Sequence, residues 1–232
     1  MRFGGVNAAL VLAVLALGQV ARADGPATNS PPLRFGVSAR TMVDLNRNDV
    51  TAALKVWMQT VARERGIPFA DEPRIFDRTE DFVAALKMGE IDIASAPSDE
   101  FLILEQAAPL AGLYSTQVGG RITEEYVVLV KTDRPWQRLE DLRGTRLLVL
   151  AASPALIPGV GAYRTSVGAD AAKKFREAAL NLGETPAGRQ LLIIFQADAF
   201  VEVTEADFAP TRAFLAAHAR LMASSAGKGV AP

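Results

Sequence analysis

The chain contains no cysteine and a single histidine, His218, among its 232 residues. The lack of cysteine excludes disulfides, thiolate nucleophiles and cysteine-ligated metal sites at once. The fold must therefore be held by its core alone, and 50% hydrophobic with 22% charged residues is enough to form one. The composition predicts an ordinary folded domain that suits an oxidising compartment such as the bacterial periplasm.

An excess of basic residues is also lacking. The chain has 25 Lys and Arg against 26 Asp and Glu, a formal net charge of −1. Removal of residues 1–23 would delete Arg2 and Arg22 and no acidic residue, so the charge would change by −2, from −1 to −3. The basic surface that nucleic acid requires is missing, and we expect no nucleic-acid partner.

The apolar run at residues 8–17 is too short to span a bilayer. It follows Arg2 and precedes Ala-Arg-Ala at residues 21–23, which is the order of a secretory signal peptide with its cleavage site. We therefore expect a signal peptide at residues 1–23 and an exported protein. Residues 24–32, rich in Pro, Ser, Asn and Thr, are expected to form a flexible leader.

Motifs of the common enzyme classes are absent. The sequence has no G-x-S-x-G, Walker A or H-E-x-x-H pattern. His218 stands in an alanine-rich helical segment without a paired nucleophile, which favours a helix-surface histidine over a catalytic one. Residues 44–48 resemble the start of a calcium loop, but Asp49 replaces the glycine and Lys55 the glutamate that such a loop needs. We predict no enzyme, no catalytic residue, no metal site and no cofactor.

Residues 33–105 alternate between short apolar strands and amphipathic helices. The first helix is expected from about Asp49 to Arg65, with Asn48 as N-cap and Gly66 just past its end. Strands and helices that alternate over short connections predict an α/β fold with a mostly parallel sheet flanked by helices. The expected strands are 33–38, 74–77 and 90–95, and the further expected helices are 79–89 and 98–105. Farther along the chain, Thr185 followed by proline predicts a helix through Phe195, and we expect a short strand at 199–203 and a final alanine-rich helix at about 210–222.

Ligands of such sheets lie beyond the carboxyl ends of the strands. Two of these ends lead into helix starts with a hydroxyl, Thr79 and Ser98, where backbone N–H groups and the helix dipole suit an oxyanion. Ordinary helix caps are the alternative for both residues, a solvated turn arginine for Arg40, and a core position for Tyr126. The candidate ligand-binding residues are Ser38, Arg40, Asp77, Thr79, Ser95, Ser98 and Tyr126.

Residues 125–130 form an almost wholly apolar run that predicts a buried strand. A polar turn at residues 132–135, a short helical piece at 139–142, Gly144 and a second apolar strand at 145–150 follow.

The order of these segments resembles the phosphate/phosphite/phosphonate family of ABC-transporter solute-binding proteins. The resemblance rests on LRFGVS at residues 33–38, FVAALKMGEIDIA at 82–94, the run described above, SPALIPGVGAYR at 153–164 and ETPAGR at 184–189. It covers roughly residues 33–205. It implies a periplasmic-binding-protein-like (type II) lobe at 33–222, with a hinge strand at about 123–132 and a return strand at about 157–165. From their terminal position, residues 223–232 are expected to form a disordered tail.

The departure from this family lies between Leu150 and Ser153, where only two alanines stand. Family members carry a complete second lobe there, so the resemblance implies a truncated second lobe, and a one-lobed clamshell cannot close. Two functions remain open. The chain is a periplasmic solute-binding component that serves an ABC-transporter permease and binds phosphate, phosphite or phosphonate. Alternatively, it is a relic that docks to a permease or sensor protein without binding solute.

Overall fold

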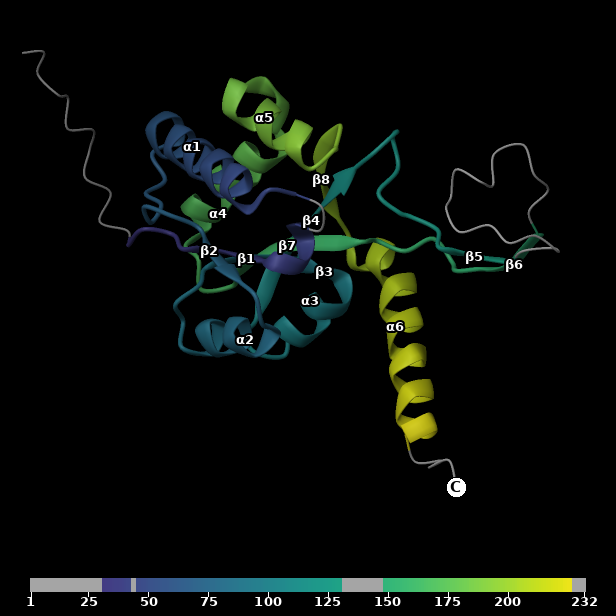
Figure 1. The fold of residues 1–232 in the computed structure, drawn as a ribbon. Helices are drawn as coiled ribbons and strands as arrows, with labels where there is room; N and C mark the ends of the chain where they lie inside the picture. Colours follow the sequence, from purple (N-terminus) through teal and green to yellow (C-terminus); the bar gives the residue numbers. More distant parts are fainter. Residues whose placement is uncertain (1–30, 43–44, 131–147, 227–232) are drawn as a thin grey trace, which may run out of the picture.

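The computed structural model describes residues 31–42, 45–130 and 148–226. Within these ranges a six-stranded sheet has helices packed on both faces, with the strand order β2-β1-β3-β7-β4-β8 (Figure 1). The expected signal peptide, most of the leader and the whole segment between the two apolar runs lie outside the described residues. The strands are β1 (Phe35–Ser38), β2 (Arg74–Phe76), β3 (Ile93–Pro97), β4 (Leu110–Gln117), β7 (Gly159–Arg164) and β8 (Ala199–Val203).

The sheet is mixed. β1 pairs in parallel with β2 and β3, as the alternation of strands and helices predicts. β7 lies antiparallel between β3 and β4, and β8 lies antiparallel at the outer side of β4. Four strands therefore point one way and two the other, and the α/β fold class is confirmed.

Two hydrophobic cores lie between the sheet and its helices, one on each face of the sheet. One core joins α1, α4 and α5 to the face that carries Phe35, Val37 and Ile93. The other joins α2, α3 and the start of α6 to the face that carries Ala94, Val160 and Ala162. The helices are α1 (Arg47–Arg65), α2 (Thr79–Lys87), α3 (Ser98–Leu104), α4 (Ala169–Leu180), α5 (Pro186–Ile194) and α6 (Glu205–Ala226), with short 3-10 turns η1 (Ala39–Met42) and η3 (Leu182–Glu184).

Helix ends follow local capping chemistry, with one shift from the prediction. Asn46, and not Asn48, caps α1, because its side-chain oxygen accepts from the N–H groups of Asn48 and Asp49. Gly66 ends this helix in the left-handed conformation at φ +64°, as expected. Thr185 caps α5 by accepting from the Gly188 N–H, with proline next in the chain, also as expected.

The strand β4 has no counterpart among the predicted elements. Its alternation is interrupted at Gly112, which adopts φ +62° where the pairing with β7 shifts register. A side chain at this position would collide with the ring of Tyr163, since a Cβ would lie 2.3 Å from it. The bulge hides the period of two by which a strand is recognised in a sequence.

The predicted buried strand at residues 125–130 is wrong in its burial. Within the described residues, β5 (Val127–Val130) pairs with β6 (Leu148–Ala152) alone, in a separate two-stranded sheet beside the main one (Figure 1). Tyr126 is 55% exposed and Val127 50% exposed. An apolar run alone does not say whether a second layer covers it.

The helix α6 starts earlier and ends later than the sequence predicts. It begins at Glu205 instead of about Pro210, because Thr204 and Asp207 bond reciprocally: the Thr204 N–H donates to Oδ2 of Asp207 at 3.0 Å, and the Asp207 N–H to Oγ1 of Thr204 at 3.2 Å. The Thr204 hydroxyl also donates to Oδ2 of Asp207 at 2.6 Å, and this hydrogen bond, together with the one from the Thr204 N–H, lowers the pKa of Asp207. The helix continues through Ala226, so the first residues of the predicted tail are helical, and it extends away from the sheet (Figure 1).

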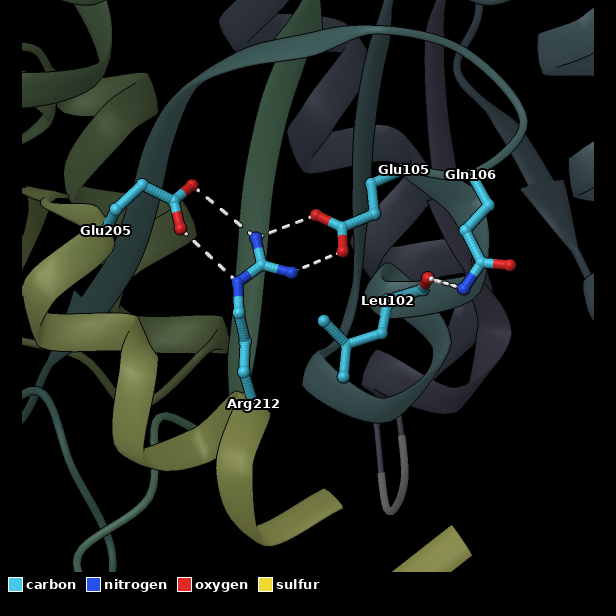
Figure 2. A network of polar contacts seen from close by, with 5 residues as sticks. All are labelled: Leu102, Glu105, Gln106, Glu205 and Arg212. Carbon is cyan, nitrogen blue, oxygen red and sulfur yellow. Dashed lines mark hydrogen bonds and ion pairs between the residues drawn. The ribbon is translucent and has the colours of Figure 1, made fainter. Parts of the chain in front are cut away.

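Figure 2 shows how α6 is fastened to α3. The guanidinium of Arg212 pairs with both carboxylate oxygens of Glu105, with Nη2 at 2.7 Å from Oε2, and also reaches Glu205 at 3.3 Å. The same guanidinium lies 4.8 Å above the ring of Phe208. The hydrogen bonds to Glu105 raise the pKa of Arg212, which stays charged at any physiological pH.

We expect Arg212→Gln to destabilise the protein by about 1–3 kcal/mol, because bidentate charged hydrogen bonds at a partly buried position are lost. Arg220→Gln, at an exposed position farther along the same helix, is the matched control and should change stability little. Urea unfolding measures both. Equal midpoints for the two variants would contradict a fastening role of Arg212.

Candidate ligand pocket

A pocket of about 490 Å³ opens at the carboxyl ends of β1 and β3. It continues between the sheet and the helices α1, α4 and α5, where Trp57, Phe175 and Leu191 line it. The opening is the edge at which ligands of α/β sheets bind, and at which the sequence predicts a site. The pocket has a polar mouth and an apolar interior.

The mouth is rich in hydroxyl groups. Thr41 and Ser115 use theirs in the fold, donating to the carbonyl oxygens of Ser38 at 2.7 Å and of Gly159 at 2.8 Å. Within the described part of the chain, the hydroxyls of Ser95 and Thr116 have no hydrogen-bond partner, although both residues line the pocket. At the mouth these two groups are free to bind a polar ligand atom, and among the other described lining residues the buried Tyr114 hydroxyl also has no partner.

Tyr126 stands at the rim of the mouth, on the segment that leads to β5. Its hydroxyl donates to Oε2 of Glu124 at 3.2 Å, and its backbone N–H donates to Oγ of Ser153 at 2.9 Å. Partial burial and the neighbouring Glu124 carboxylate raise the pKa of Tyr126. The phenol is therefore protonated near neutral pH and can donate a hydrogen bond.

A buried carboxylate lies beneath the mouth of the pocket. Glu100 is 1% exposed, lies in the first turn of α3, and accepts from the Ser38 hydroxyl at 2.5 Å. Arg40 Nη1 lies 3.8 Å from Glu100, and its Nη2 lies 2.7 Å from Asp99. The Ser38 hydroxyl also accepts from the Arg40 N–H at 3.2 Å. The Arg40 guanidinium and the helix start together stabilise the buried charge, and the pair with Asp99 orients the guanidinium.

The structure gathers some of the predicted site residues and leaves others elsewhere. Arg40, Ser95 and Tyr126 line the pocket. Ser38 lies beneath it, bound to Glu100, and the buried Ser98 donates to the Ile157 carbonyl at 2.5 Å. Asp77 is exposed and pairs with Arg47 at 2.7 Å, while Thr79 opens α2 outside the pocket lining.

Neither helix-start hydroxyl is an N-cap, which was the alternative interpretation. The capping positions are Arg78 for α2 and Pro97 for α3, and neither side chain makes a capping hydrogen bond. Thr79 and Ser98 are instead the first helical residues.

Sequence reasoning missed Thr41, Ser115, Thr116 and Glu124 as pocket residues. Thr116 was in reach of the same rule, because β4 points in the same direction as β3 and its end lies at the same edge. The strand itself was not recognised, so its end was not considered. Glu124 lines the pocket from the segment just before β5, and no pattern in the sequence predicts this position.

The described residues contain no group of three or more His, Cys, Asp or Glu that could hold a metal ion. No helix among them is long and apolar enough to cross a membrane.

No protein-family model and no curated protein matches this sequence. Solved structures share its fold. The protein XAC2383 from Xanthomonas citri, bound to ATP, has a TM-score of 0.60 at 14% identity, over 83% of this chain and 98% of that chain. A binding-protein component of an ABC phosphonate transporter from Pseudomonas aeruginosa has a TM-score of 0.58 at 10% identity, over 79% and 85%. PhnD1 from Prochlorococcus marinus, in complex with methylphosphonate, has a TM-score of 0.55 at 9% identity, over 75% and 93%.

These neighbours show that this chain shares the fold of the binding-protein component of an ABC phosphonate transporter. The resemblance inferred from the order of the sequence segments is thereby confirmed at the level of the fold. At this low sequence identity the shared fold does not show which ligand this chain binds, and the candidate ligand-binding residues stay predictions.

We expect Ser38→Ala to lower stability by about 1–3 kcal/mol, because the buried Glu100 carboxylate loses a hydrogen-bond donor. Ser95→Ala removes a hydroxyl without a partner in the described structure and should stay within about 0.5 kcal/mol of the parent. Chemical denaturation in ligand-free buffer distinguishes the two. If Ser95→Ala were as destabilising as Ser38→Ala, the division between structural and free hydroxyls would be refuted.

Proposed function

We propose that this protein is the periplasmic solute-binding component of an ABC transporter and that it binds phosphate, phosphite or a phosphonate at the pocket mouth. The observation that carries the proposal is the set of donors at the strand ends, the Arg40 guanidinium with the free hydroxyls of Ser95 and Thr116, beside the Tyr126 phenol at the rim. A guanidinium offers paired donors to an oxyanion, and hydroxyls complete its hydrogen bonds. The fold shared with phosphonate-transporter binding proteins supports the same class of ligand.

Charge at the mouth sets the strength of such binding. Among the described residues that line the pocket, Arg40 is the one cation and Glu124 the one carboxylate. Arg40 already pairs with Asp99 and Glu100, so its field is partly neutralised before a ligand arrives. The hydroxyl groups must therefore contribute a large share of the affinity, and Glu124 opposes any anion at the mouth.

Removal of the positive charge of Arg40 and of the negative charge of Glu124 should change ligand affinity in opposite directions. Arg40→Gln should weaken phosphate or methylphosphonate binding roughly tenfold or more, because a charge-assisted hydrogen bond is lost. Glu124→Gln should strengthen binding of the same ligands, because a like charge is removed while an amide of similar shape remains. Isothermal titration of the purified protein measures both changes.

Arg121→Gln is the matched control. Arg121 lines a neighbouring hollow that shares Thr116 and Glu124 with the mouth, but it does not line the pocket itself. Its loss removes the same charge and should alter affinity much less than Arg40→Gln. Equal losses for the two arginine variants would show that overall charge, and not a site at the strand ends, governs binding.

A docking domain without solute remains the second candidate, because α6 extends from the body (Figure 1). Apolar side chains on this helix are exposed, among them Phe214 and Met222. Its partner would be a membrane permease or a sensor protein. Thermal unfolding with phosphate, phosphite, alkylphosphonates and sulfate separates the two candidates. A ligand at a hundred times its Kd raises stability by about 2.7 kcal/mol. A cooperative transition that none of these anions shifts would favour docking.

A further inference from the structure

The pocket is larger and more apolar than a small oxyanion requires. Beyond the mouth it is enclosed by helices on one side and the sheet on the other. Trp57 and Phe175 meet there edge to face, with ring centroids 6.2 Å apart, and Phe175 meets Tyr114 at 5.9 Å. The interior side chains are Leu54, Trp57, Phe175, Leu182, Leu191 and Phe200.

The floor of this interior lacks a side chain at the central strand. Along β7, Val160 and Ala162 are buried in the core on the opposite face of the sheet, so Gly161 faces the pocket. A Cβ at Gly161 would meet nothing closer than the Ala94 carbonyl oxygen at 3.8 Å, and the residue does not have positive φ. Neither a close approach nor the backbone conformation requires glycine there. Its effect is to leave space above the sheet.

We infer that the solute of this pocket is amphiphilic, with an anionic head at the mouth and an aliphatic or aromatic tail in the interior. This rests on the proposed function, because the same mouth would bind the head. A volume of about 490 Å³ lies within the range of pockets that hold ligands of drug size. Water gains little in an interior with so few polar partners, whereas an apolar tail is transferred favourably into it.

The test is a series of alkylphosphonates, from methyl through butyl to octyl and decyl, titrated calorimetrically below their micelle concentrations. Affinity should rise about threefold to fourfold for each methylene that enters the interior, until the chain no longer fits. The heat-capacity change of binding should become more negative along the same series, which marks burial of apolar surface.

Variants of the glycine at the floor make the test specific. Gly161→Ala, Gly161→Val and Gly161→Leu should reduce the affinity gain per methylene in steps, since their side chains fill the interior. Because Gly161 pairs with Ser95 across the sheet, the methylphosphonate affinity of each variant is the reference for its own series. Valine also suits a strand, which protects folding. Phe200→Ala, which widens the interior, should move the best chain length upward. Gly183→Ala, outside the pocket, is the control that should change neither ligand.

Each outcome bears on one of the two proposals. Methylphosphonate binding without any gain along the series would overturn the tail inference and leave the proposed function standing. A gain along the series that 1-octanol reproduces with equal affinity would uphold the apolar interior and overturn the anionic head. Failure of every ligand to bind would overturn both. An unchanged chain-length gain in folded Gly161→Leu would also overturn the inference, because the tail would then lie elsewhere.

Discussion

The fold depends on the insertion of β7 between β3 and β4. Its backbone hydrogen bonds join β2, β1 and β3 on one side to β4 and β8 on the other. Without it each half would present an open edge. The same strand forms the floor of the pocket and divides the two cores, since its residues face α1, α4 and α5 or α2 and α3 in turn. Sheet continuity, core separation and pocket shape therefore share one cause.

Helices could be predicted from the sequence where a local pattern alone marks their course and their ends. The helix α1 shows apolar residues at helical spacing and a glycine at its end, and α5 shows Thr185 followed by proline, so both were found near their true bounds. β4 was missed because Gly112 interrupts its alternation. The exposure of Val127 was missed because burial depends on what covers a strand, which a single sequence does not contain.

The sequence predicted where the candidate site lies, but only some of the residues that line it. The rule on strand ends leads to Arg40 and Ser95, and both line the pocket. Ser38 and Ser98 stand at equally favourable positions, yet both bond to partners about sixty residues away, Glu100 and the Ile157 carbonyl. A hydroxyl at a strand end is available for a ligand only if no distant group uses it. Such pairings are set by tertiary packing, which residue types alone do not reveal.

The position of β7 in the chain also has a consequence for biosynthesis. The edge of β3 that β7 pairs with is complete at Pro97, whereas its partner begins at Gly159. A chain that enters its folding compartment from the N-terminus therefore presents β3 about sixty residues before β7. During this time the nascent β2-β1-β3 unit offers unpaired backbone groups to other chains. A chaperone that shields this edge until β7 emerges would therefore improve the yield of folded protein.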